Sequence, residues 1–387
     1  MMTTQKKELI IWHEFDGPGD TSIQVLEQLC EEYSKEYGIQ VTAEVMNLKE
    51  LIDRLNNIAN GGKTAHMAFV PADMAVFWKS ALYSEVPESL SSIVEAFGTN
   101  DLSSMQVGAI QYGLPILKGN HMVLYYNREI FNKSPESWEE IESLSSQLKQ
   151  QGIVSIGADL QDPYWFIPFF TAFGGLPVHE GRPTFLNHEM QQALHFVSDQ
   201  MEAGILTSLS GSNELLEDFI AGKVGAIICG EWIYNYLDQQ MGARLGIGKL
   251  PAINGAPSVS MSSSIGLVYP NRSLDVESEW REEIISFSKF MLSEECQHKW
   301  GTKVQRIPVH PEVQKQLVST YSPNRAQLTE QLRNSRPIPI EAVMSSIWSA
   351  MGPGLHQLQH GAVRAFNTME QTFQEMNSKD GREKVES

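Results

Sequence analysis

The first 80 residues alternate short apolar segments with longer amphipathic ones, and this order constrains the fold more than any other feature of the chain. Residues 9–12 and 67–70 are short and apolar, as buried strands are, and residues 39–45 alternate apolar and polar side chains. Between them, residues 23–37 and 48–59 carry apolar side chains at helical spacing. Because a strand–helix–strand order brings successive strands together in parallel, the sequence predicts an α/β fold.

A second series of strands and helices follows residue 120. The strands that we predict there are 122–126, 153–157, 225–230, 245–250 and 265–269. The helices that we predict are 138–149, 213–221, 280–291, 294–300 and a C-terminal helical part over about 340–376, broken at 351–354. Residues 253–264 are small and polar, and we interpret them as a loop that crosses between two lobes.

Length and composition narrow the class of protein. A chain of 387 residues has room for two lobes of ordinary size, and 42% hydrophobic and 20% charged residues are globular values. With 29 basic and 47 acidic residues the net charge is −18, which disfavours nucleic acid and anionic lipid as partners. No apolar run approaches the ~18 residues that span a bilayer, so we expect no membrane insertion. The opening residues, MMTTQKKEL, show no apolar segment of an export signal; either the protein acts in the cytoplasm or this sequence has lost that signal.

Motifs of known enzymes are missing from the sequence. HExxH, CxxC, GxSxG and GxGxxG do not occur, and the ten histidines show no metal-ligand spacing. Residues 61–64, GGKT, imitate the end of a phosphate-binding loop, but Asn57 stands where that loop needs glycine. Cys30, Cys229 and Cys296 lie far apart and form no CxxC pair. We expect buried free thiols at Cys30 and Cys229, and one disulfide stays open as an alternative. We therefore predict no catalytic residue, metal or cofactor.

Carboxylates stand beside aromatic residues at several predicted loops and helix starts. Sugars present apolar CH faces and many hydroxyls. Aromatic rings cover the CH faces, and carboxylates bind the hydroxyls. Ligands of parallel sheets sit at the carboxyl ends of strands, which points to the loops 13–20 and 71–73. His13, Glu14 and Asp16 lie close together in one loop, which also suggests an acid/base pair or metal ligands. Their spacing in a loop, however, does not fix the ~5 Å separation of two carboxylates that glycoside hydrolysis needs. The pairs are Phe15 with Glu14 and Asp16, Tyr164 and Trp165 with Asp162, Trp232 with Glu231, and Trp348 after Glu341.

The order of several motifs resembles the solute-binding proteins of carbohydrate ABC importers, in their maltose-binding-protein-like class. The motifs are GLPI at 113–116, VLYYNR at 123–128, LQDPYW at 160–165 with Gly174-Gly175 beyond it, Gly222-Lys223, GEW at 230–232, RIPV at 306–309 and Trp348. The resemblance covers nearly the whole chain in the same order.

This resemblance implies a periplasmic-binding-protein-like fold, in which two α/β lobes joined by crossing hinge segments close on a ligand in the cleft between them. The first lobe would take residues 1–118 and 264–318, and the second would take 119–263 and 319–387. It also implies a monomer outside the cytoplasm that delivers a small carbohydrate to the permease subunits of an ABC importer. The ligand-binding residues that we predict are His13, Glu14, Asp16, Asp73, Asn120, His121, Asp162, Tyr164, Trp165, Trp232, Ser264, Arg306 and Trp348.

Alternatives remain at this point. A binding protein for glycerol phosphate or a similar phosphorylated polyol would need cations at the site, and Arg306 and Lys118 are the nearby candidates. A sensory module that presents a sugar to a receptor would use the same site. A sugar-cleaving enzyme is a third alternative, which an assay of glycoside turnover separates from the others.

Overall fold

The computed structural model describes residues 7–209 and 212–386, and these residues form two compact units. Unit 1 comprises Met1–Asn120, Trp232–Tyr236 and Ser262–Tyr321, and unit 2 comprises His121–Glu231, Leu237–Met261 and Ser322–Ser387. The chain thus passes between the units after Asn120, Glu231, Tyr236, Met261 and Tyr321. Residues 119–263 are predicted to lie in one lobe, whereas Trp232–Tyr236 pack with unit 1.

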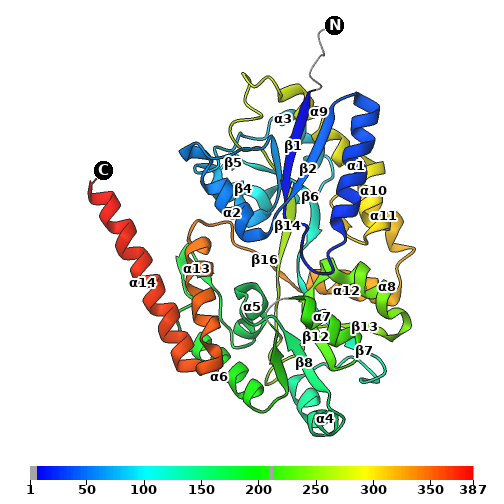
Figure 1. Ribbon diagram of the computed structural model, residues 1–387, viewed down its shortest axis with the longest axis vertical. Coiled ribbons are helices and arrows are strands. Elements are labelled where there is room, and N and C mark those ends of the chain that lie inside the picture. Colours follow the sequence, from blue (N-terminus) through cyan, green and yellow to red (C-terminus); the bar gives the residue numbers. More distant parts are fainter. Residues whose placement is uncertain (1–6, 210–211, 387) are drawn as a thin grey trace. The chain divides into compact units, whose positions relative to one another are not determined.

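Unit 1 is built on a twisted mixed sheet, with strands in the order β15-β6-β14-β3-β1-β2 (Figure 1). As predicted from the strand–helix alternation, β1 pairs in parallel with β2 and β3; Ile11 lies opposite both Ala43 and Met67. By contrast, β14 runs antiparallel to β3 and β6. The strands are β1 Glu8–His13, β2 Gln40–Val45, β3 Met67–Pro71, β6 Gly113–Gly119, β14 Met261–Val268 and β15 Ile307–Pro308, with a small hairpin of β4 Gln106–Val107 and β5 Ile110–Gln111.

Helices cover this sheet and bury their apolar stripes against it. Leu26, Leu29 and Tyr33 of the first helix are fully buried in the same cluster as Ile11 and Phe69 of the sheet. The helices of unit 1 are α1 Ser22–Tyr37, α2 Leu48–Asn56, α3 Glu88–Glu95, α9 Arg281–Leu292, α10 Glu294–Lys303 and α11 Pro311–Val318, with short 3-10 helices η1 Ile58–Asn60, η2 Ala72–Trp78 and η3 Asp101–Met105.

Unit 2 has its own sheet, with strands in the order β11-β8-β12-β7-β13. Its strands are β7 Met122–Asn127, β8 Val154–Ala158, β11 Leu206–Ser208, β12 Val224–Gly230 and β13 Leu245–Gly248. A separate short pair forms between β9 Val178–His179 and β10 Arg182–Pro183, and the short strand β16 Arg336–Pro337 pairs with β14. The helices are α4 Trp138–Gln150, α5 Pro163–Ala172, α6 His188–Glu202, α7 Ser212–Ile220, α12 Pro323–Arg333, α13 Val343–His356 and α14 Ala362–Glu386, with η5 Gly242–Arg244 and η6 Leu358–His360. Two further elements, η4 Glu231–Ile233 and α8 Tyr234–Met241, are shared between the units.

The C-terminal helices do not break where the sequence predicts. Residues 351–354 were expected to interrupt them, but α13 runs through Pro353, and the chain turns instead between α13 and α14. Ser349 and Pro353 are both exposed, so water reaches the carbonyl group that proline leaves without its helical partner. α13 and α14 run side by side in Figure 1 and pack against each other. This packing outweighs the tendency of glycine and proline to end a helix.

The predicted crossing loop 253–264 is also partly wrong, because β14 begins at Met261. The polar residues Ser263 and Ser264 look like a loop in sequence, but they pair with Gly119 and Lys118 of β6. Ladder hydrogen bonds from a neighbouring strand thus extend the strand beyond its apolar part.

All three cysteines are buried free thiols. Cys30 and Cys296 lie in the core of unit 1, and Cys229 lies in β12 of unit 2. Burial raises the pKa of each thiol, to about 12 for Cys30 and Cys229 and about 11 for Cys296. Among the described helices, none combines the length and the apolar composition that crossing a membrane requires.

Gly354 provides a test of the contact between α13 and α14. A Cβ at this position would lie 2.2 Å from Cγ of Met369 and 2.8 Å from the Ala365 carbonyl oxygen. We predict that Gly354→Ala lowers the free energy of unfolding by about 1–3 kcal/mol, because the backbone of α14 has to move. Urea denaturation measures the change.

Gly352 is the matched control in the same helix, because a Cβ there meets nothing within 4 Å. Gly352→Ala should stabilise the protein by about 0.5–1 kcal/mol, as expected for a helix interior. Equal effects of the two substitutions would contradict the close packing at Gly354.

Candidate functional site

The loop that follows β1 carries the first predicted ligand-binding residues. The Phe15 backbone N–H donates to Nδ1 of His13 at 3.2 Å, so the ring proton is on Nε2. His13 is fully buried, and its Nε2 has no hydrogen-bond partner among the described residues. Burial lowers the pKa of His13 to about 4, so the ring is neutral at physiological pH. The side chain thus offers one N–H donor and no charge.

Glu14 lies at the centre of an acidic group in unit 1. Burial, together with the negative charges of Asp20, Asp73 and Asp16, raises its pKa to about 8 against the opposing charge of Arg306. The charges that act on Glu14 thus come from distant parts of the chain, and the ligand-binding role of Glu14, Asp16, Asp73 and Arg306 stays a prediction. At neutral pH the Glu14 carboxyl is mostly protonated and can both donate and accept a hydrogen bond.

Arg306 is almost fully buried, with 1% of its side chain exposed, and it faces the start of α1. Its guanidinium donates to the Ser22 hydroxyl at 3.0 Å and lies 3.8 Å from a carboxylate oxygen of Asp20. Asp20 also accepts the Ser22 backbone N–H at 2.8 Å. Asp20 was not among the predicted ligand-binding residues, yet it pairs with the arginine and its charge raises the pKa of Glu14.

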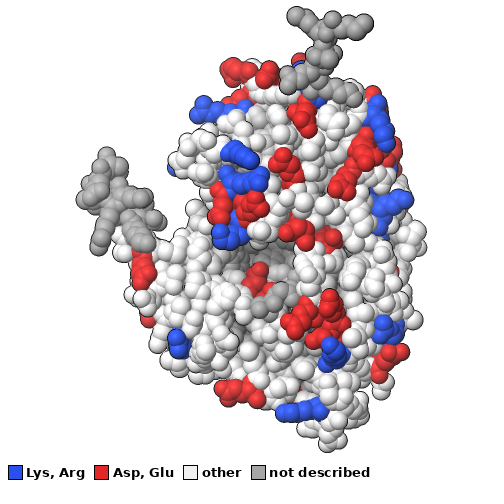
Figure 2. Space-filling model, viewed as in Figure 1, with Lys and Arg blue, Asp and Glu red and all other residues white. Residues whose placement is uncertain are grey.

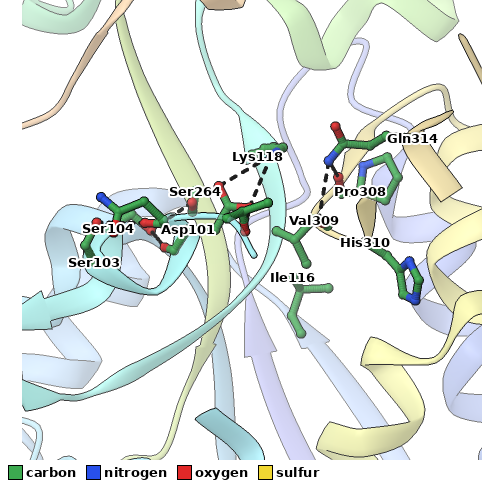
Figure 3. A network of polar contacts seen from close by, with 12 residues as sticks. Asp101, Ser103, Ser104, Ile116, Lys118, Ser264, Pro308, Val309, His310 and Gln314 are labelled. Carbon is green, nitrogen blue, oxygen red and sulfur yellow. Dashed lines mark hydrogen bonds and ion pairs between the residues drawn. The ribbon is translucent and has the colours of Figure 1, made fainter. Parts of the chain in front are cut away.

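Asp73 and Ser264 are held by β14 and its neighbours. The Ala72 backbone N–H, next to Asp73, donates to the Ser263 hydroxyl at 3.1 Å. Ser264 is buried and accepts a 2.8 Å hydrogen bond from Ser104 of η3, as Figure 3 shows. Ser263 was not among the predicted residues, because nothing in sequence links it to a turn 190 positions earlier.

Lys118, the second cation considered from sequence, forms an ion pair with Asp101. Its ammonium group lies 3.1 Å from Asp101, and both side chains are largely buried (Figure 3). The same close-up shows Gln314 donating to the carbonyl groups of Pro308 and Val309, in the segment that follows Arg306.

Unit 2 supplies an aromatic group at the start of α5. Asp162 caps this helix by accepting the Tyr164 backbone N–H at 2.7 Å, which fixes the next two side chains. The ring of Tyr164 meets those of Trp165 and Trp348 at centroid distances of 6.4 Å each, edge to face. All three rings are half-buried. Trp348 comes from α13, so two remote segments build one aromatic surface.

Asp162 itself is poorly solvated. Burial raises its pKa to about 6, and the nearby charge of Asp159 adds to this effect, against the hydrogen bond from Tyr164. Asp159 was not predicted from sequence. Since it lies just after β8, the rule that ligands gather at the carboxyl ends of strands would have found it.

Asn120 and His121 stand at the crossing between the units. Asn120 has a positive φ of 47°, in the left-handed region that asparagine tolerates better than most residues. His121 is fully buried, and its Nε2 lies 2.9 Å from the Leu328 carbonyl oxygen. The His121 ring thus serves the interior of unit 2, and a ligand contact for either residue stays a prediction.

Charge around these groups is mixed. Figure 2 shows acidic side chains in several separate patches on one face of the molecule, with basic side chains set among them. Within the described residues, no three histidine, cysteine, aspartate or glutamate side chains are placed to hold a metal ion.

Comparison with known protein families identifies the family of this chain. The profile described as bacterial extracellular solute-binding protein matches residues 28–326. The chain belongs to this family.

Curated relatives are distant but extend over most of both chains. A maltooligosaccharide ABC transporter solute-binding lipoprotein of Streptococcus pneumoniae is 21% identical over 342 residues, which are 84% of this chain and 78% of that protein. The sn-glycerol-3-phosphate-binding periplasmic protein of Pectobacterium atrosepticum is 20% identical over 370 residues, covering 86% and 81%. A maltodextrin-binding protein of Bacillus subtilis is 19% identical over 310 residues, covering 73% and 72%.

The raised pKa of Glu14 has a consequence for stability. An unfolded glutamate loses its proton near its ordinary pKa of 4.5, whereas folded Glu14 keeps it up to about pH 8. The folded state therefore binds more protons in this window, and the stabilisation is lost as pH rises through 8. We predict that Glu14→Gln flattens the fall in unfolding free energy between pH 6.5 and 8, measured by urea denaturation without added sugar.

This window avoids the other shifted groups. Asp162 titrates near pH 6, and the lowered pKa of His13 gives an opposite slope between about 4 and 6.5. Glu95→Gln, which replaces an exposed carboxylate of α3, is the control and should keep the wild-type slope. An unchanged slope in Glu14→Gln would show that Glu14 is ionised in the folded protein.

Proposed function

We propose that this protein is the solute-binding component of an ABC importer and that it captures a carbohydrate by hinge closure. The proposal rests on the family, on the relatives named for maltooligosaccharide and maltodextrin, and on the two groups of side chains described above. The observation that carries it is the aromatic surface of Tyr164, Trp165 and Trp348 beside the capping carboxylate Asp162.

The chemistry of these groups suits a neutral sugar. The aromatic rings cover the CH faces of a pyranose, each stack adding on the order of 1 kcal/mol beyond its area term. Glu14, Asp16 and Asp73 of unit 1 bind hydroxyls, and neutral His13 adds a donor. Several such contacts reach micromolar affinity, which corresponds to about −8 kcal/mol. Closure follows because the sugar binds the closed state better than the open one.

Binding of a phosphorylated polyol is the alternative, since one relative is named for sn-glycerol 3-phosphate. Phosphate capture needs cations that converge on the ligand. Here Arg306 is held beside Asp20, and Lys118 is paired with Asp101. Asp20, Asp73 and Asp16 also place negative charge around Glu14, which opposes a dianion. We therefore favour an uncharged carbohydrate.

The partners follow from this function. A solute-binding component passes its ligand to permease subunits outside the cytoplasm, and it performs no chemistry on the ligand. We propose the same for this chain, with no catalytic residue or cofactor. Monomeric action and an extracytoplasmic location belong to the same proposal.

Calorimetric titration against glucose, maltose, maltotriose and sn-glycerol 3-phosphate tests the ligand class. We expect micromolar binding of at least one sugar and at least tenfold weaker binding in Trp232→Ala, because one aromatic platform is lost. Trp280→Ala is the control, since Trp280 packs on His66 away from the predicted residues. Binding of glycerol phosphate alone would replace the carbohydrate proposal by its alternative.

Small-angle X-ray scattering tests closure. The radius of gyration of the full chain should fall when the sugar that binds in calorimetry is added at saturating concentration. Trp232→Ala at the same sugar concentration, below its own saturation, should show a smaller fall. A radius of gyration that stays constant on saturation would argue for binding without hinge motion.

A further inference from the structure

Asn235 stands three positions after Trp232, and its side chain makes contacts that bear on how this segment is held. Asn235 lies in the first turn of α8, directly after the 3-10 turn η4 that contains Trp232. Residues three apart in such turns share one side of the helix. The side chain of Asn235 is 4% exposed, so the partners of its amide determine how this turn is held.

Both ends of the Asn235 amide are engaged within unit 1. Its Nδ2 donates to the Thr21 hydroxyl at 2.9 Å, and its Oδ1 accepts a longer contact of 3.4 Å from Gln305. Thr21 precedes α1 but makes no side-chain cap hydrogen bond to it, so its hydroxyl is available for Asn235.

These partners belong to the acidic group around Glu14. Thr21 lies between Asp20 and Ser22, which hold Arg306, and Gln305 is the residue before that arginine. Gln305 adopts a positive φ of 57°, a conformation that long side chains rarely adopt and that surrounding contacts have to maintain. Asn235 thus joins the turn of Trp232 to the segments that carry Asp20 and Arg306.

We propose that Asn235 is a positioning residue, which holds the Trp232 ring beside the carboxylates of unit 1 through the Thr21 hydroxyl. The inference rests on the proposed function, because it concerns how a sugar-stacking tryptophan is oriented. It assigns Trp232 to the hydroxyl-binding side of the site, separate from the aromatic surface around Tyr164. A ring held next to carboxylates covers one face of a sugar while the acids bind the hydroxyls at its edge.

Fluorine NMR of the full chain labelled with 5-fluorotryptophan tests the orientation of the Trp232 ring. The variant Trp232→Phe assigns the Trp232 resonance. Asn235→Ala and Thr21→Val should both shift the Trp232 resonance, because each removes one partner of the same hydrogen bond. Thr21→Ser keeps the hydroxyl and should leave the resonance at its wild-type position. The other tryptophan resonances should not move.

Maltotriose titration supplies the functional readout. We expect Asn235→Ala and Thr21→Val to weaken binding by about tenfold, the usual effect of a lost buried hydrogen bond, and Thr21→Ser to restore it. The matched control is Asn324→Ala in unit 2. Asn324 is 8% exposed and also uses both ends of its amide, with Leu245 and Arg128 as partners. This control should lower the melting temperature but change neither the Trp232 resonance nor the affinity.

The outcomes separate this inference from the function on which it rests. If wild-type protein binds no sugar, the proposed function fails, and the resonances still decide whether Asn235 orients Trp232. If Asn235→Ala and Thr21→Val leave the Trp232 resonance unmoved, or if Thr21→Ser shifts it as much as Thr21→Val does, the positioning role is overturned. Weaker binding in Asn324→Ala to the same extent would also overturn it, because general destabilisation would then explain the effect.

Discussion

The parallel pairing of β1 with β2 and β3 is the constraint on which the candidate site in unit 1 depends. Parallel strands end at the same edge of the sheet, so the loop after β1 and the turn after β3 are neighbours. Glu14 and Asp73 lie 59 positions apart in the chain, yet the charge of one acts on the pKa of the other. Side chains gathered in this way share a poorly solvated region, and each acid there makes the next one harder to ionise.

Each cation near these acids is paired with a carboxylate. Arg306 and Lys118 each lie beside an aspartate inside unit 1, and both are sheltered from solvent. A buried charge without a partner would be strongly destabilising, so these pairs are first of all requirements of folding. They also shape recognition, because a cation already matched with a carboxylate attracts an anionic ligand less. The proposed preference for an uncharged ligand thus follows from the ion pairs that unit 1 needs in order to fold.

Much of the fold could be predicted from the sequence because its signals are local. Apolar periodicity located β1, α1, β2 and β3. The two failures have a common cause. Pro353 and the serines at the start of β14 carry local signals for a break and a loop, but contacts with α14 and β6 outweigh those signals. Neither partner adjoins its segment in sequence.

The difference between local signals and contacts distant in sequence also separates the predicted site residues from the missed ones. Glu14, Asp16 and Asp73 could be predicted because strand ends are visible in sequence, and the tryptophans because motif order resembles a known family. Asn235 makes its contact with a residue 214 positions away, and Ser263 with one 191 positions away. Such partners are specified only by the folded chain. The ligand-binding role of every residue named here is a prediction of chemistry, which binding measurements decide.

The burial of Cys30, Cys229 and Cys296 has a consequence for a protein that would work outside the cytoplasm. Oxidants there attack thiolates that they can reach, and buried thiols of raised pKa supply almost none. The native state is therefore inert to cross-linking, whereas a chain that has not yet folded exposes all three sulfurs at once. If the chain is exported, oxidative damage would fall on molecules that have not yet folded, and faster folding would leave more of them with their thiols intact.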